Sequence, residues 1–273
     1  MLIKQVLQLV LYGQILQDKK NNNDLKDIGK SNLSWYVENG WLPEIPDVGE
    51  VPANLEDCSW TTIQKLINSD TFKNYYKIGD TKSVTLSNGE KLVMRVESIN
   101  DGDGDSGFYY PKGTVDFIST TCMNNTIKAN NSNSSISWDS TNLRLYCNND
   151  IYSLLPSQLQ NSIVEKTHNY YNNNYESFIE ASDKIWIPTV FELFGPGAYT
   201  YDEGGSYNKH YALYDSSSSR IKKLGLSGQN ANNYWTSSRR SDAGRFGMVT
   251  TTGTLSDSLF ASNLGLVIGF RIG

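Results

Sequence analysis

The pair Asn88-Gly89, set between two short stretches in which apolar and polar residues alternate, constrains the fold of this 273-residue chain most strongly. Both residue types tolerate the positive φ angles that hairpin turns use, so residues 84–86 are predicted to pair with residues 92–96 as antiparallel strands. Further strand-like runs occupy residues 113–120, 233–240, 245–255 and 265–272. Short strands, few long helices and long ordered loops predict an α+β fold with short antiparallel sheets.

Two or three helices are expected beside these sheets. Ser59 or Asp57 can accept the hydrogen bond that caps a helix before the hairpin. Residues 137–164 carry leucines and isoleucines at helical spacing and predict two short helices. Residues 183–195 are apolar enough to predict a buried strand followed by a turn.

The N-terminal segment divides into two parts before the main domain. In residues 1–20, apolar side chains recur at intervals of four, three and seven positions from Leu2 to Leu16, which predicts an amphipathic helix for attachment or oligomerisation. Docking on its own domain, self-assembly and a degenerate export signal all fit this helix, which is too polar to span a bilayer. Residues 21–54 predict a polar and then Pro-rich connector, and residues 55–273 the main domain.

Charge and composition argue against several classes of function. The net charge of −5 and the lack of a basic stripe disfavour a nucleic-acid partner. Three widely spaced cysteines indicate neither a disulfide framework nor a zinc site. The chain has two distant histidines and no recognisable catalytic motif, so a non-enzymatic protein is expected. An unrecognised carboxylate pair for glycoside hydrolysis stays open as an alternative.

The segment NDGDGDSG, residues 100–107, is the sharpest local motif. Asp101, Asp103 and Asp105 alternate with glycines, and carboxylates on such a flexible loop can surround Ca²⁺, which takes six to eight oxygen ligands. The motif is not a full EF-hand, because Lys112 stands where the bidentate Glu is needed. Calcium binding is therefore one interpretation, and a solvated acidic turn is the other.

Tyrosines recur in the loop that follows Gly195-Pro196-Gly197. Aromatic faces stack on sugar rings and supply rigid contact area, so these side chains are candidates for ligand binding. Packing of these tyrosines between a long loop and the core explains their presence equally well. The candidate residues are Tyr199, Tyr201, Tyr207 and Tyr211.

The strand at residues 232–246 is the second candidate for ligand binding. Side chains alternate between the two faces of a strand, so Tyr234 and Trp235 are predicted to point to opposite sides. With Trp235 in the core, Tyr234 and Arg240 face outward, and an exposed set of Tyr, Arg and Asn is typical of a binding hot spot. The neighbours expected beside them are Asn232, Arg245 and Phe246.

The order of several motifs resembles a known family. The C-terminal motifs are YWTSS at 234–238, FGMV at 246–249 and GFR at 269–271, after IGD at 78–80, Trp138 to Arg144, and Leu155-Pro156 to Leu159. Over residues 58–273 this order resembles an uncharacterised family of gut-bacterial and phage surface domains with a C-type-lectin-like fold. The Glu-Pro-Asn type of sugar motif found in calcium-dependent lectins is absent.

The resemblance implies a binding role rather than catalysis. Some such domains are similar to phage tropism determinants, in which the last stretch forms the receptor-binding face of a trimer. It implies a phage tail or virion protein that recognises a bacterial surface glycan or protein, joins other virion proteins through its N-terminal segment and forms a homo-oligomer. A bacterial surface adhesin and a structural or decorating virion protein are the alternatives, because a fold alone does not fix a function.

Overall fold

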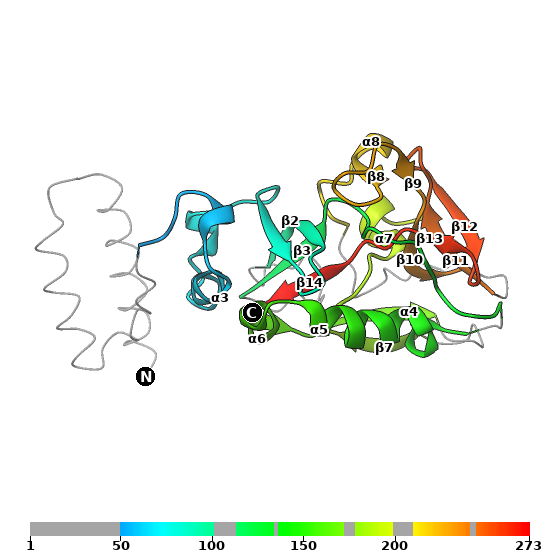
Figure 1. Cartoon of the computed structure of the whole chain (residues 1–273), viewed down its shortest axis with the longest axis horizontal. Coiled ribbons are helices and arrows are strands. Elements are labelled where there is room, and N and C mark those ends of the chain that lie inside the picture. The colour runs from blue at the N-terminus through cyan, green and yellow to red at the C-terminus, as the bar shows by residue number, and fades with distance from the viewer. Residues whose placement is uncertain (1–49, 101–112, 134–135, 172–177, 199–209, 241–243) are drawn as a thin grey trace, which may run out of the picture. The chain divides into compact units, whose positions relative to one another are not determined.

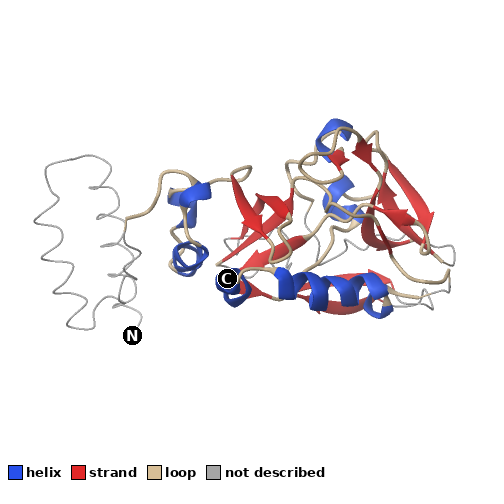
Figure 2. Ribbon diagram, viewed as in Figure 1, coloured by secondary structure: helices blue, strands red, loops and turns tan. Residues whose placement is uncertain are grey.

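The computed structural model describes residues 50–100, 113–133, 136–171, 178–198, 210–240 and 244–273, which all belong to one compact unit, Val48–Gly273. The predicted N-terminal helix, residues 1–20, and most of the predicted connector lie outside the described residues. The fold mixes a few short helices with several small antiparallel sheets (Figures 1 and 2). This agrees with the predicted α+β class.

The largest sheet has five strands in the order β1-β2-β3-β14-β5. The predicted hairpin is confirmed: β1 pairs with β2, Val84 lies opposite Leu92, and Gly89 takes a φ of 86° in the turn. The C-terminal strand β14 pairs with β3 on one side and with β5 on the other, and Figure 1 shows β14 beside β3. The strands are β1 (Thr81–Thr85), β2 (Lys91–Asn100), β3 (Thr114–Ser119), β14 (Gly269–Ile272) and β5 (Ile163–Val164).

A three-stranded sheet and three strand pairs complete the β structure of the described residues. The three strands are β10 (Tyr234–Arg239), β11 (Arg245–Val249) and β12 (Leu255–Leu259). The pairs are β4 (Ile127–Lys128) with β13 (Asn263–Leu264), β6 (Lys166–Tyr171) with β7 (Phe178–Asp183), and β8 (Lys222–Lys223) with β9 (Ala231–Asn232). All of these pairings are antiparallel.

The described helices are short. α3 (Trp60–Asn68) begins at Ser59, whose side chain accepts a hydrogen bond from the Thr62 amide, as predicted. The other α-helices are α4 (Asn142–Leu145), α5 (Tyr152–Leu154), α6 (Ser157–Ser162), α7 (Val190–Phe194) and α8 (Ser217–Arg220). The 3-10 turns are η1 (Leu55–Asp57), η2 (Phe72–Asn74) and η3 (Trp138–Ser140), and η4 (Tyr146–Ile151) is a π-helical turn that joins α4 to α5.

The prediction of a strand and turn at residues 183–195 is wrong. Residues 190–194 form helix α7, because Thr189 and Glu192 make a capping box in which each side chain accepts a hydrogen bond from the other residue's backbone. Residues 184 and 185 bend after β7, and Trp186 forms an isolated bridge with Gly269. A Cβ atom at position 269 would lie 2.5 Å from the Trp186 indole, so this close approach requires glycine.

The core consists of two apolar clusters that meet at the three-stranded sheet. Trp235 and Phe246 belong to the larger cluster, whereas Tyr234 and Val249 belong to the smaller one. Trp235 is fully buried, which confirms it as a core anchor. Because both faces of β10 are covered, every residue of this strand is buried. The prediction that Tyr234 faces outward is therefore wrong.

Candidate functional site

The structure buries three of the aromatic residues that the sequence nominated for ligand binding. Tyr234 donates a hydrogen bond to the Arg220 carbonyl oxygen at 2.8 Å, and Phe246 packs against Phe260 with ring centroids 4.6 Å apart. Tyr211 is likewise buried. Alternation along a strand predicted one exposed aromatic side chain, but it assumed that one face of the strand meets solvent. Tyr211, Tyr234 and Phe246 are therefore core residues.

Tyr211 belongs to a buried polar network. Its hydroxyl lies 3.0 Å from an Asp116 oxygen and 3.2 Å from a Glu192 oxygen, which share its single proton, and it accepts a hydrogen bond from the Lys166 ammonium at 2.9 Å. Arg271 pairs with Asp116 through two bonds of 2.6 and 3.0 Å. Burial alone would raise the pKa of Asp116, but the Arg271 guanidinium outweighs it and holds that pKa below its usual value. This network ties β14 to β3 and α7.

The predicted arginines do come together at one end of the three-stranded sheet. Arg240 follows β10, Arg245 begins β11, and the guanidiniums of both form ion pairs with Asp257 of β12. The Arg245–Asp257 distance is 2.6 Å, and the Arg240–Asp257 contact is also direct. The side chain of Arg240 is 44% exposed and that of Arg245 is 41% exposed, whereas the Asp257 side chain is 13% exposed. We call these three residues the arginine pair site.

The register of the sheet explains this convergence. Asp257 lies opposite Gly247, and Arg245 lies opposite Leu259, so Arg245 and Asp257 are diagonal neighbours on one face. The β10–β11 register shifts between Trp235 and Arg239, and this irregularity ends with the Arg240 amide donating to the Arg245 carbonyl oxygen at 3.2 Å. Two cations therefore share one carboxylate, which leaves one positive charge in excess.

The remaining predicted site residues divide into two groups. Asn232, at the end of β9, is partly buried, and its side-chain nitrogen has no hydrogen-bond partner among the described residues. Tyr199, Tyr201 and Tyr207 lie outside the described residues, as do the calcium candidates Asp101, Asp103 and Asp105. Within the described ranges, no group of three or more His, Cys, Asp or Glu side chains is placed to hold a metal ion.

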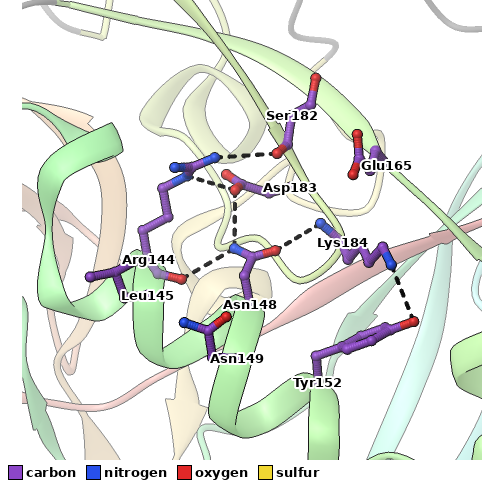
Figure 3. Close-up of a pocket in the computed structure, with 9 residues that line it drawn as sticks. All are labelled: Arg144, Leu145, Asn148, Asn149, Tyr152, Glu165, Ser182, Asp183 and Lys184. Atoms are coloured by element: carbon purple, nitrogen blue, oxygen red, sulfur yellow. Dashed lines mark hydrogen bonds and ion pairs between the residues drawn. The ribbon is translucent and has the colours of Figure 1, made fainter.

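The structure also contains a polar pocket that sequence reasoning missed. It has a volume of ≈ 370 Å³ and lies between the helical run α4–η4–α5 and the end of β7 (Figure 3). Helical residues line one wall, and residues from the β5–β6 connection and the end of β7 line the other. The lining residues are Arg144, Leu145, Asn148, Asn149, Tyr152, Glu165, Ser182, Asp183 and Lys184.

Asp183 organises the floor of this pocket. One carboxylate oxygen accepts hydrogen bonds from Arg144 at 2.6 Å and from Asn148 at 3.0 Å. The other oxygen bonds to Trp138 at 2.9 Å and His168 at 2.8 Å. Burial alone would raise the pKa of Asp183, but its bonds with His168 and Trp138 and the Arg144 charge together lower it.

Asn148 holds the two walls of the pocket together. Its side-chain nitrogen donates to the Ile185 carbonyl oxygen at 3.0 Å and the Arg144 carbonyl oxygen at 3.2 Å. Its side-chain oxygen accepts from the Lys184 and Ile185 amides at 2.9 and 3.2 Å. The sequence offered one signal for this role: two asparagines and an aspartate, at positions 148–150, interrupt an otherwise helical segment.

Residues 112–268 match the family described as Domain of unknown function (DUF6273). This match spans more than half of the chain. The chain belongs to this family. The matched range of the DUF6273 domain includes both the arginine pair site and the polar pocket.

The other comparisons add no relative. The search of curated proteins found no match, and neither did the search of solved structures. In the part of the chain that the structure describes, no helix has the length and apolar character needed to cross a membrane.

Proposed function

We propose that this protein is a non-enzymatic recognition module that binds a bacterial surface glycan or protein through the exposed end of the β10–β12 sheet. The observation that carries the proposal is the convergence of Arg240 and Arg245 on Asp257. A strand surface with exposed arginines on a rigid scaffold has the composition of a binding hot spot.

The chemistry of the arginine pair site suits a ligand with oxygen acceptors. Each guanidinium has five N–H donors, and Asp257 accepts from one nitrogen of each arginine. The donors that remain face a partly exposed surface, where they can bind carboxylates, phosphates or sugar hydroxyls. Asp257 holds both arginine side chains in place before a ligand binds. Less side-chain entropy is therefore lost on binding, which favours affinity.

Two of the buried carboxylates, those of Asp183 and Asp116, are placed for structure rather than for catalysis. A general base needs a lone pair that can reach a substrate proton. Asp183 accepts four hydrogen bonds, and Asp116 is fully buried and paired with Arg271. Both carboxylates are therefore committed to holding the fold.

The cellular setting that we propose rests on the resemblance of the sequence motifs to gut-bacterial and phage surface domains. We place the module on the surface of a phage virion, as part of a tail or capsid protein, or else on a bacterial cell surface as an adhesin. The N-terminal segment would join it to other virion proteins, and the active assembly would be a homotrimer. Ca²⁺ on Asp101, Asp103 and Asp105 belongs to the same proposal. A decorating virion protein without a specific ligand is the competing function.

Binding to glycan and protein fractions extracted from gut-bacterial surfaces tests the proposal. We expect saturable binding by the wild type that falls about tenfold or more in Arg240→Ala/Arg245→Ala, because two charged contacts are removed. The double variant Lys77→Ala/Lys91→Ala is the matched control, since both lysines are exposed and lie outside the β10–β12 sheet.

Four outcomes separate the alternatives. Loss of binding in the arginine variant alone supports the site, and loss with EDTA supports the calcium loop. Equal binding by both double variants rejects the arginine pair site. Absence of binding to every fraction by the folded wild type favours the decorating function.

A further inference from the structure

The polar pocket beside β7 has a rigid floor, and polar groups at its rim retain hydrogen-bonding capacity. On the floor, Asn148 and Asp183 use their side-chain atoms in bonds to each other and to both walls, so the pocket shape does not depend on a ligand (Figure 3). A π-helical turn, Tyr146–Ile151, carries Asn148 and Asn149. Such turns are rare and are found disproportionately at functional sites.

At the rim, several polar groups have capacity left for a ligand. In the described structure, the side chains of Glu165 and Asn149 are exposed and form no hydrogen bond or ion pair. The Lys184 ammonium lies 3.5 Å from the Tyr152 hydroxyl, at the limit of a hydrogen bond. The guanidinium of Arg144 reaches carbonyl oxygens of Asp139 and Ser182 only at 3.3 Å. The rim therefore offers donors and an acceptor close together.

The charges of the pocket balance. Arg144 is neutralised by Asp183, with which it forms an ion pair at 2.6 Å. Lys184 and Glu165 then contribute one positive and one negative charge to the same cavity. A strongly anionic or cationic ligand would meet a like charge, whereas a neutral ligand with many hydroxyl groups can donate to the carboxylate and accept from the ammonium.

The size and the lining of the pocket restrict the class of ligand further. A volume of ≈ 370 Å³ is near the lower end of the range of small-molecule sites, about 300–1,000 Å³. Most side chains of the lining are polar, and the ring of Tyr152 is covered by the Lys184 ammonium at 4.7 Å from its centroid. An apolar ligand would leave these polar groups unpaired, which costs affinity.

We propose that this pocket binds one neutral monosaccharide unit, with Glu165, Lys184 and Asn149 as the residues that contact its hydroxyl groups. The inference goes beyond the proposed function and does not rest on it, because no residue of the pocket belongs to the β10–β12 sheet. The pocket is therefore a second ligand site on the same domain.

Chemical-shift mapping of the ¹⁵N-labelled full chain tests this site. The probes are the methyl glycosides of glucose, galactose, mannose and N-acetylglucosamine, with glucuronate and alanine as the anionic and zwitterionic comparisons. We expect at least one neutral glycoside to bind with a millimolar dissociation constant and to shift the amides of residues 148–152 and 184. Shifts elsewhere only, or none up to the solubility limit of the glycosides, would overturn the proposal.

Conservative variants assign the contacts without disturbing the floor. Glu165→Gln and Lys184→Met should each weaken glycoside binding about tenfold, the loss expected when one charged hydrogen bond is removed. Glu180→Gln and Lys223→Met are matched controls at exposed positions outside the pocket and should change the affinity less than about twofold.

The remaining outcomes are also decisive. Binding that is equal in the wild type and in both pocket variants would reject this site, as would binding of glucuronate or alanine in place of the neutral glycosides. Arg240→Ala/Arg245→Ala should keep the glycoside affinity. The pocket can thus be rejected or supported whether or not the arginine pair site binds its own ligand.

Discussion

Replacing Asp183 by asparagine should destabilise the domain strongly, although the two side chains have nearly the same shape. The carboxylate is fully buried and accepts hydrogen bonds from four donors. A side-chain amide at this position can accept with its oxygen alone, so its nitrogen must face donors. Two of the four bonds are therefore lost.

The size of the effect follows from these bonds. A hydrogen bond to a charged group contributes roughly 1.5–3 kcal/mol, so two bonds contribute about 3–6 kcal/mol. The Arg144 side chain is 25% exposed, and water can replace part of what it loses. We therefore expect the free energy of unfolding to fall by about 3 kcal/mol, at the lower end of this range. The melting temperature should fall by roughly 6–12 °C for a domain of this size.

Urea denaturation followed by circular dichroism measures this loss, with Glu180→Gln as the exposed control on the same strand. The pKa of Asp183 is lowered in the folded state, so its stabilising effect is present above the pKa of the unfolded state, about 3.9. That effect is lost as pH falls through the folded-state pKa. The difference in the free energy of unfolding between wild type and variant should therefore become smaller below about pH 4. The reasoning would be refuted if the variant lost less than about 1 kcal/mol of its free energy of unfolding at pH 7. It would also be refuted if the difference between the two proteins did not change with pH.

Two further predictions concern the core. Arg271→Met should lower the free energy of unfolding by about 3–5 kcal/mol, because it leaves the buried Asp116 carboxylate without its cation, and an effect near zero in chemical denaturation would contradict this ion pair. The three cysteines are buried and unpaired, and burial raises the pKa of the Cys122 thiol to about 12. A thiol reagent should therefore modify none of them in the native protein and all of them in urea, whereas fast native labelling would show that the thiols are accessible.

Local signals in the sequence predicted the parts of the fold that depend on neighbouring residues. The turn at Asn88-Gly89 and the cap at Ser59 need only a few adjacent residues, and both are confirmed. Helix α7 was missed because its apolar residues also suit a buried strand. The distinguishing feature was the capping box of Thr189 and Glu192, which stands in the sequence as a Thr followed three residues later by a Glu.

The candidate site depended on contacts that local patterns do not contain. Both faces of β10 are covered by segments distant in sequence, so alternation did not reveal which face is exposed, and Tyr234 was placed wrongly. The sequence nominated Arg240 and Arg245 but not Asp257, which the strand register brings to them. The pocket joins residues up to about forty positions apart, such as Arg144 and Asp183, and no pairing rule links them before the fold is known.

Binding isotherms on intact gut-bacterial cells test the central claim most directly. The wild type, Arg240→Ala/Arg245→Ala and Lys77→Ala/Lys91→Ala would be titrated on the same panel of strains, after circular dichroism confirms that all three are folded. The account predicts saturable binding by the wild type and the lysine variant to at least one strain, with an affinity about tenfold or more lower for the arginine variant. Indistinguishable isotherms for the three proteins, or no binding to any strain, would contradict it.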